Sequence, residues 1–236
     1  MPNLDKSLIA GFPPFQDLST EEMEFVLSHA RSAHYSRDSA IFSQGEVAQS
    51  FFLLLSGHVR VVRTSPEGDQ VIVRYINEGE LLGIAIAMGA PTYPATAVAA
   101  VDCIVLAWPN AVWPQMQERL PSFCTSTYRT IGTRLQETHD RILEISNEQV
   151  EQRIARALLR LVQQAGRKSD EGVAIDFPIT RQDIAEMTGT TLHSVSRLLS
   201  GWESEGIVKN GRQKVVVTDP HQLALIAENR HTRRKA

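Results

Sequence analysis

The sequence lacks features that several large classes of protein require. Its 236 residues include only two cysteines, Cys103 and Cys124, which are too few for a disulfide framework or for ligating an iron–sulfur cluster by themselves. It has no run of eighteen apolar residues and no N-terminal signal pattern, so we expect a soluble, cytoplasmic protein that does not enter a membrane. The absence of a Walker loop, a His-Glu-x-x-His motif and a Gly-x-Ser-x-Gly elbow argues against an enzyme.

The small formal charge of −3 hides a basic C-terminal third. From Val150 to the end, the chain carries 14 Lys and Arg against 10 Asp and Glu, a net charge of +4. The preceding residues carry 10 against 17, a net charge of −7. This asymmetry is typical of a nucleic-acid-binding module attached to another domain.

Residues 179–208 predict two short helices joined by a tight turn, followed by a strand. Thr180 and Asp183 have the spacing of a capping box at the start of the first helix. Gly189 tolerates the positive φ of a helix–helix corner, and Thr191 follows as the cap of the second helix. We expect the buried side of this second helix to consist of apolar residues at helical spacing: Leu192, Val195, Leu198 and Leu199.

The outward side of the second helix suits the major groove of duplex DNA, which admits one helix. We expect four of its side chains to contact base edges: His193, Ser194, Ser196 and Arg197. Residues 206–217 predict a β-hairpin wing with cations near its tip. The expected phosphate contacts are Thr180, Arg181, Thr190, Thr191 and Arg212. A helical hairpin with a solvated polar face is the alternative interpretation.

Short apolar segments separated by turns between residues 40 and 108 predict an antiparallel barrel or sandwich. Helices should follow after Pro109, with a further helix over 150–164 and a loop over 166–172. In the first long helix, apolar residues and one Thr recur at spacings of three and four, as in a coiled-coil seam. They are Tyr128, Ile131, Leu135, Thr138, Ile142 and Ile145. A homodimer along this seam is favoured, and an amphipathic helix packed on its own domain is the alternative.

Several motifs in the same order resemble the CRP/FNR family of bacterial transcription regulators. They lie at 55–61, at the Gly68 turn, and at 78–83, 150–155, 180–185 and 195–198. The resemblance covers nearly the whole chain. It implies an α+β protein with an N-terminal antiparallel β-roll of cyclic-nucleotide-binding type over 1–118, a dimerisation helix over 119–148 and a winged helix-turn-helix over 149–236. It also implies an effector-gated homodimer that binds palindromic double-stranded DNA, usually to activate transcription with RNA polymerase as a partner.

Two departures from the family pattern concern specificity. Cyclic-nucleotide-binding members carry Gly-Glu early in their phosphate cassette and Arg-Ser near its end, where this chain has Gly83-Ile84 and Pro94-Ala95. A cyclic phosphate would meet no cation and the ribose would meet an isoleucine, so the sequence argues against cAMP. In many members a Glu stands at the position of His193. Because Glu and His present different hydrogen-bonding groups, the half-site should differ from the common family sequences.

Residues 88–97 and 189–198 resemble the nitric-oxide-responsive regulators of denitrification, a resemblance that implies sensing through haem. By spacing from the Arg153 motif, Thr138 and His139 stand where dimer-helix residues of the cyclic-nucleotide-binding members reach the effector pocket. His139 is therefore the candidate haem ligand, and a solvated or seam-flanking histidine is the alternative. The four cysteines of the cluster-bearing oxygen sensors are absent. A cyclic-nucleotide-type regulator and a ligand-free, constitutive regulator of the same family remain alternatives.

Overall fold

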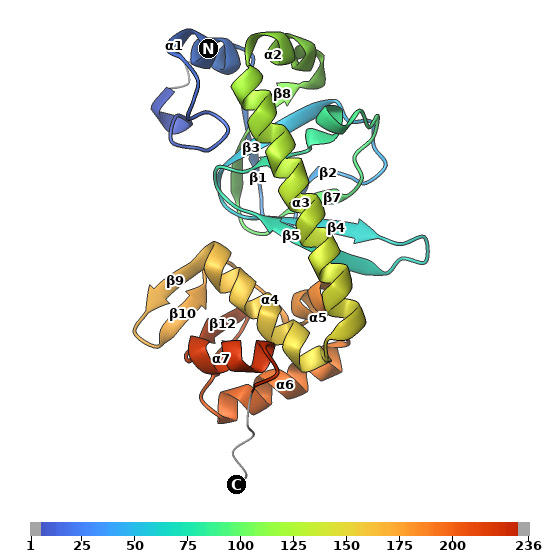
Figure 1. Cartoon of the computed structure of the whole chain (residues 1–236), viewed down its shortest axis with the longest axis vertical. Helices are drawn as coiled ribbons and strands as arrows, with labels where there is room; N and C mark the ends of the chain where they lie inside the picture. The colour runs from blue at the N-terminus through green and yellow to red at the C-terminus, as the bar shows by residue number, and fades with distance from the viewer. Residues whose placement is uncertain (1–5, 231–236) are drawn as a thin grey trace. The chain divides into compact units, whose positions relative to one another are not determined.

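The computed structural model describes residues 6–230. The chain folds as two compact units, Met1–Glu137 and Thr138–Ala236. The long helix α3 (Pro121–Asn147) contributes to both units (Figure 1). The first unit is built mainly from antiparallel strands, and the second is helical with one small sheet. The predicted α+β class, with a β-roll, a long helix and a helix-turn-helix, is therefore confirmed.

Two four-stranded antiparallel sheets form the roll in the first unit, in the orders β1-β8-β3-β6 and β2-β7-β4-β5. The strands are β1 (Arg31–Tyr35), β2 (Ala40–Phe42), β3 (Ser50–Ser56), β4 (Val59–Thr64), β5 (Gln70–Ile76), β6 (Leu81–Leu82), β7 (Thr96–Ala99) and β8 (Cys103–Pro109). Gly57 turns the chain from β3 into β4 at φ 102°, and a Cβ there would lie 2.7 Å from the Asp102 carbonyl oxygen. Only glycine fits this turn without displacing backbone.

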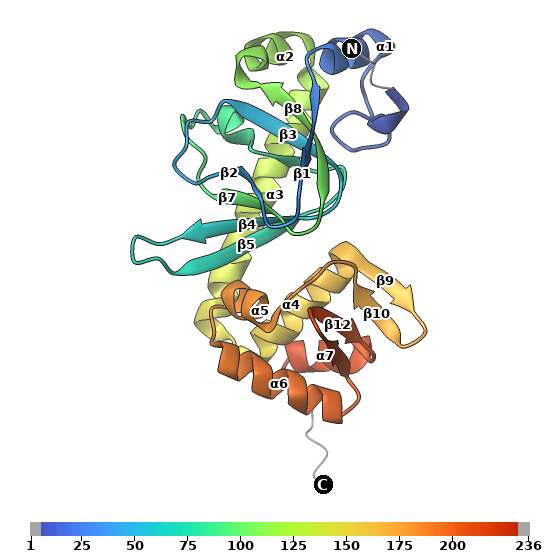
Figure 2. The same ribbon diagram turned by 180° about the vertical axis from the view of Figure 1, so that it is seen from behind.

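Helical segments flank the roll. Two precede it, η1 (Lys6–Leu8) and α1 (Thr20–Ser28), and η2 (Ile84–Met88) lies between β6 and β7. Three follow it: η3 (Asn110–Val112), α2 (Trp113–Arg119) and α3. Ser19 and Glu22 form a capping box that starts α1, because the carboxylate of Glu22 accepts the Ser19 N–H at 2.7 Å and the Ser19 hydroxyl accepts the Glu22 N–H at 3.3 Å. In Figures 1 and 2 the start of α3 lies beside α2 and β8.

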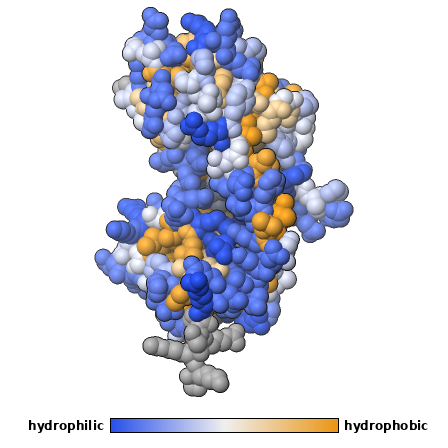
Figure 3. All heavy atoms as spheres, in the orientation of Figure 1, coloured by the Kyte–Doolittle hydropathy of each residue, from blue (hydrophilic) through white to orange (hydrophobic). Residues whose placement is uncertain are grey.

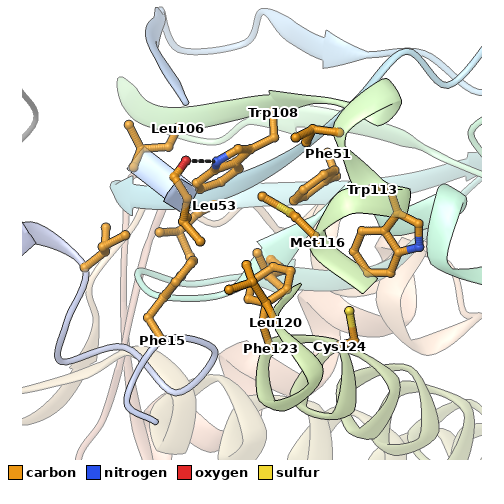
Figure 4. Packing of buried hydrophobic residues seen from close by; sticks show 14 of the residues in the cluster. Phe15, Phe51, Leu53, Leu106, Trp108, Trp113, Met116, Leu120, Phe123 and Cys124 are labelled. Carbon is orange, nitrogen blue, oxygen red and sulfur yellow. Dashed lines mark hydrogen bonds between the residues drawn. The ribbon is translucent and has the colours of Figure 1, made fainter. Parts of the chain in front are cut away.

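An aromatic core fastens the N-terminal segment and the start of α3 to the roll (Figure 4). The Trp108 ring stacks on Phe51 at 5.4 Å, and Phe15 packs on Phe123 at 5.5 Å between ring centroids. The buried indole N–H of Trp108 donates to the carbonyl of Val26 at 2.9 Å. This bond satisfies the polar group that a buried tryptophan brings with it.

The second unit surrounds a four-stranded sheet of order β11-β12-β10-β9. Its elements after α3 are α4 (Val150–Ala165), β9 (Gly166–Ser169), β10 (Gly172–Ile175), α5 (Arg181–Thr188), α6 (Leu192–Ser204), β11 (Val208–Gly211), β12 (Lys214–Val217) and α7 (Pro220–Ala227). Helix α4 buries an apolar side that includes Ile154, Leu158 and Leu161. None of the helices within residues 6–230 has the length and apolar character that crossing a membrane requires.

Two local predictions were wrong. Residues 166–172 do not form a loop but the hairpin β9–β10, in which β10 also pairs with β12. All four residues of β9 are exposed. The sequence therefore lacks the alternation of apolar and polar residues that indicates a half-buried strand. Leu192 is not on the buried side of the second helix: it is 47% exposed, because it is the first residue of α6 and precedes the stripe that begins at Val195.

Candidate nucleic-acid interface and effector domain

Local capping fixes the two helices of the helix-turn-helix. The Thr180 hydroxyl accepts the Asp183 N–H at 3.0 Å, and the Asp183 carboxylate accepts the Thr180 N–H at 2.7 Å. Gly189 ends α5 in the left-handed conformation at φ 59°. The Thr191 hydroxyl then accepts the Ser194 N–H at 3.2 Å and starts α6. The corner is therefore held by hydrogen bonds at both of its helix ends.

Helix α6 separates a buried face from a polar one. Val195, Leu199 and Trp202 are buried. His193 and Arg197 are exposed and, being four residues apart, share one face of the helix. Ser194 and Ser196 are half-buried. Of the predicted phosphate contacts, Arg212 and Thr191 are exposed, whereas Thr180, Arg181 and Thr190 are half-buried.

The wing is fastened to α6 by Asn210. The Asn210 N–H donates to one carboxylate oxygen of Glu203 at 2.8 Å, and its side-chain amide donates to the other at 3.1 Å and to the Leu199 carbonyl at 3.1 Å. These hydrogen bonds, the backbone one first, lower the pKa of Glu203. The turn of the wing is Arg212-Gln213, with Gln213 at φ 56°. The sequence analysis missed the Asn210–Glu203 pair, which no local spacing rule indicates.

A groove of about 300 Å³ lies where the start of α5, the start of α6 and the wing meet. Its lining includes Thr180, Arg181, Leu192 and Lys214. The structure thus gathers two predicted phosphate contacts and the exposed Leu192 at one concave surface. Polar, cationic and apolar groups all face the same space.

Arg153 connects three parts of the second unit. Its Nε donates to the Thr188 carbonyl at 3.0 Å and its Nη1 to the Glu148 carbonyl at 3.1 Å. Longer bonds of 3.4 Å reach the carbonyls of Ile145 and Gly189. A guanidinium at the carboxyl ends of α3 and α5 complements both helix dipoles. Its side chain therefore joins the end of the long helix to the corner of the helix-turn-helix.

A second set of arginines braces the same end of α3. Arg160 donates to the Glu144 carboxylate at 2.5 Å, and Arg156 pairs with Glu148 at 2.9 Å. Arg156 also donates to the Ala227 carbonyl at 2.9 Å, which reaches the end of α7. The network attaches α4 to the last two turns of α3 at several points.

The predicted dimer seam is uncovered in the single chain. Tyr128, Leu135, Ile142 and Ile145 are 45–56% exposed, whereas Ile131 is half-buried against the aromatic core. Leu143, which the sequence analysis did not include, is also exposed at 59%. Hydrophobic residues reach the surface along α3 in Figure 3. An apolar stripe of this kind on a single helix is suited to a second helix.

The interior of the roll is apolar where a cyclic phosphate would be expected. Gly83 adopts φ 68°, and a Cβ there would lie 3.1 Å from the Phe52 ring and 3.2 Å from the Phe42 ring. The Phe42 ring also stacks on Tyr93 at 4.0 Å. Ile84 and Ala95 are buried, and Pro94 is exposed. The roll therefore places aromatic carbon and a buried Ile84 where a ribose phosphate would need polar partners.

The histidines do not assemble into a metal centre. Thr138 and His139 are exposed on α3 in the second unit, and His58 is hydrogen-bonded through Nδ1 to the Asn77 side chain at 3.1 Å. Within residues 6–230, no three His, Cys, Asp or Glu side chains come together as metal ligands would. Cys103 is buried, and burial raises the pKa of its thiol.

A winged helix-turn-helix beside a long helix with an exposed apolar stripe, with a β-roll in the same chain, defines a DNA-binding transcription regulator whose β domain receives a small effector. Residues 32–119 match the cyclic nucleotide-binding domain and residues 152–226 match the Crp-like helix-turn-helix domain. The chain belongs to the CRP/FNR family of transcription regulators and is not an enzyme. Regulators of this family bind DNA as dimers.

Known relatives span nearly the whole chain. It is 31% identical over 217 residues to the cyclic AMP receptor protein of Thermus thermophilus, covering 92% of this chain and 97% of the relative. It is 26% identical to the cAMP-activated global transcriptional regulator CRP of Salmonella typhimurium, covering 83% and 93%. The structure of FixK2 from Bradyrhizobium japonicum has the same fold, with a TM-score of 0.74, 21% identity and coverage of 84% and 96%.

Proposed function

We propose that this chain acts as a homodimer that binds a palindromic duplex and recruits RNA polymerase in response to a small effector. The observation that carries the proposal is the polar face of α6, where His193 and Arg197 are exposed while Val195 and Leu199 are buried on the opposite side. A helix of this form enters a major groove with its buried face supported by the domain.

Base recognition falls to four residues of α6: His193, Ser194, Ser196 and Arg197. Arg197 has the reach and geometry for a bidentate pair with guanine, and His193 and the serines are hydrogen-bonding groups for neighbouring base edges. Phosphates are contacted by Thr180, Arg181, Thr190, Thr191 and Arg212, which set the register on the duplex and contribute most of the salt dependence.

Dimerisation uses the apolar stripe of α3. The partner's α3 would cover Tyr128, Leu135, Ile142 and Ile145, together with Ile131 at the edge of the core. Pairing two copies along a helix produces the two-fold symmetry that a palindromic operator requires. The functional division into 1–118, 119–148 and 149–236 stays a prediction, since the compact units divide within α3.

The effector acts by changing the position of α3. Ile145 and Glu148, at and just beyond its carboxyl end, offer carbonyls to Arg153, which also binds the corner between α5 and α6. A shift or rotation of α3 would therefore move the helix-turn-helix through this side chain. Such small helix shifts are a standard way for a bound ligand to change a distant surface.

Nitric oxide sensed through haem is the specific effector that the resemblance implies, with His139 as the candidate ligand. The residues around the predicted pocket do not fit a macrocycle. Phe42, Phe52 and Tyr93 fill the interior, and His139 is exposed. Binding of cAMP, for which several relatives are named, does not fit this chain either, because Ile84 and Pro94 replace the polar residues that it needs.

The test is selection of operators from a palindromic DNA library by the purified full-length protein. It is run under anaerobic conditions without cofactor, with haem, and with haem plus nitric oxide. If the wild type selects one palindrome and the Arg197→Ala variant does not, the result would support base recognition by α6. A stoichiometric Soret band with selection that depends on nitric oxide, both lost in His139→Ala, would establish the haem form. Selection without any cofactor would leave DNA binding intact and refute haem. Failure to select any palindrome under all conditions would refute the proposed function.

A further inference from the structure

A polar cavity of about 510 Å³ lies in the first unit, outside the interior of the roll. Its lining comes from the N-terminal segment at Gln16 and Asp17 and from α3 between Ser122 and Glu137. Arg74 and Glu80, from β5 and the turn after it, close one side. None of the predicted effector-pocket residues in the first unit, Gly83, Ile84, Pro94 or Ala95, belongs to the lining.

The walls of this cavity are held by the aromatic core. Phe15 and Phe123 are fully buried and packed on each other. Phe15 directly precedes the cavity residue Gln16, and Phe123 lies one helical turn before the cavity residue Ser126. The turn at Gly79 is also fixed, because Phe12 packs where a Cβ would be. A site whose walls are already ordered loses little conformational entropy when a ligand binds.

Three guanidinium groups line the cavity. Arg134 donates to the Leu81 carbonyl at 2.5 Å, and burial, together with the neighbouring Arg74, lowers its pKa to about 10. Arg74 pairs with Glu137, and burial lowers its pKa as well. Two like charges in one partly buried place favour an added anion. Arg129 is exposed and forms no ion pair with any residue of the described chain.

The lining holds three carboxylates and three guanidinium groups, but two of the carboxylates already have partners. Glu80 already accepts the Asn77 N–H at 2.7 Å, and Glu137 pairs with Arg74. Asp17 is the third carboxylate of the lining. On the α3 wall, Ser122, Thr125 and Ser126 add hydroxyl groups. Guanidinium groups and hydroxyl donors suit the oxygens of a phosphate, and the Asp17 carboxylate suits the hydroxyl groups of the same ligand.

The cavity and the dimer stripe use different faces of α3. Successive residues of an α-helix turn by about 100°, so the cavity residues Ser122, Ser126 and Arg129 project roughly opposite to Leu135 and Ile142. A partner helix on the apolar stripe would therefore leave this wall open. Ligand binding and dimerisation are compatible on one helix.

We propose that this cavity is the effector site and that it binds a small organic phosphate carrying hydroxyl groups. The inference rests on the proposed function, since an effector is meaningful only for a DNA-binding regulator. A bound phosphate would draw Arg129 and the start of α3 toward Arg74 of β5. The helix that carries the dimer stripe would move with it.

The test uses the full-length protein, with glucose 6-phosphate as the probe and glucose as its uncharged counterpart, followed by isothermal titration. We expect saturable binding of the phosphate only, weakened roughly 10-fold or more in Arg129→Gln because a charge-assisted hydrogen bond is lost. Arg63→Gln, an exposed arginine on β4 outside the cavity lining, is the matched control and should bind as the wild type does. Inorganic pyrophosphate serves as a second probe that carries charge without hydroxyl groups.

DNA binding separates the two proposals. Wild type and Arg129→Gln should select the same palindrome, and the phosphate should change the operator affinity of the wild type at least 5-fold. If the palindrome is selected but neither phosphate probe binds, the proposed effector site is wrong and the proposed DNA-binding function is retained. The same conclusion follows if wild type and Arg129→Gln bind the probe equally. The effector site is also wrong if the probe binds without changing operator affinity. If no palindrome is selected, the proposed function fails first.

A second inference rests on a different observation, the exposed Leu192. This side chain is the first residue of α6, lies next to His193 and lines the groove between α6 and the wing. The Leu192 side chain is 47% exposed and stands between the exposed polar residues Thr191 and His193 at the start of α6. On DNA, the apolar group that a major groove offers is the C5 methyl of thymine. We infer that Leu192 selects thymine at one half-site position.

Replacing single thymines of the selected operator by deoxyuridine removes that methyl and nothing else. At one symmetric pair of positions, wild-type affinity should fall about 3-fold or more, as expected for one lost methyl contact in each half-site. Leu192→Ala should bind the two operators equally, whereas His193→Ala should retain the deoxyuridine penalty. Equal binding of both operators by the wild type, or an undiminished penalty in Leu192→Ala, would overturn the inference.

Discussion

Replacing Arg153 by methionine should loosen the helix-turn-helix without unfolding the first unit. Methionine keeps much of the aliphatic stem and removes the guanidinium, so packing is largely retained. Four carbonyls lose their donor: those of Thr188 and Glu148, at 3.0 and 3.1 Å, and those of Ile145 and Gly189, at 3.4 Å. The two shorter bonds dominate, because hydrogen-bond strength falls with length.

The magnitude follows from these two bonds. A hydrogen bond to a charged group contributes about 1.5–3 kcal/mol, and the side chain is only half-buried, so solvent replaces part of the loss. We expect the free energy of opening of α5 and α6 to fall by about 2–4 kcal/mol. The first unit should keep its stability, because all four carbonyls belong to the second unit.

Hydrogen exchange followed by mass spectrometry measures this locally, because amides in α5 and α6 report the opening of that segment. Arg167→Met is the control: it removes an exposed guanidinium from β9 in the same unit, one that pairs with Asp176 at the surface. Its cost should be no more than about 1 kcal/mol. If protection of α5 and α6 in Arg153→Met stays within about 0.5 kcal/mol of wild type, or falls equally in Arg167→Met, the special role of Arg153 is refuted.

Three further predictions concern DNA and assembly. Arg197→Ala should weaken binding to the selected operator by about 1–3 kcal/mol and leave non-specific binding unchanged, measured by fluorescence anisotropy on both duplexes; equal losses on both would contradict base reading. Arg212→Ala should reduce the slope of log affinity against log salt by about 0.9 for each wing, measured over a salt titration, while the operator preference is kept. Leu135→Glu places a charge in the apolar stripe and should convert the dimer to a monomer in sedimentation experiments. Gln136→Glu, at the adjacent exposed position, should leave the dimer intact. A dimeric Leu135→Glu protein would exclude this seam.

Features with local causes could be predicted from the sequence. The capping box of Thr180 and Asp183, the corner at Gly189 and the cap at Thr191 each depend on residues within a few positions of one another, and each is present. The alternation of short apolar strands with turns likewise depends on nearest neighbours, and it indicated the β-roll. These elements could be predicted because the local preferences of their residues agree with the tertiary structure.

The errors arose where distant residues decide the outcome. Residues 166–169 form a strand because β10 lies beside them, although their own side chains are solvated. Leu192 fits the apolar spacing of α6 but sits one turn before the helix meets its core, so spacing alone misplaced it. The polar cavity joins Asp17, Arg74 and Arg129, which are far apart in the chain. No sequence period brings such residues together, so only the fold could indicate the site.

The helix α3 combines these functions, and this has a thermodynamic consequence. Phe123 anchors its start, Arg129 faces the polar cavity, Leu135 belongs to the apolar stripe, and Ile145 near its end offers a carbonyl to Arg153. A ligand can shift this helix only by as much as its affinities for the two positions differ. Linkage then requires reciprocity: if a phosphate changes operator affinity by some factor, saturating operator must change phosphate affinity by the same factor. Titrating the phosphate into free protein and into the operator complex measures both sides. Because reciprocity holds for any equilibrium, the plateau separates the mechanisms: a phosphate in the cavity changes operator affinity by a finite limiting factor, whereas one that competes with DNA phosphates at Arg181 or Arg212 lowers it without limit.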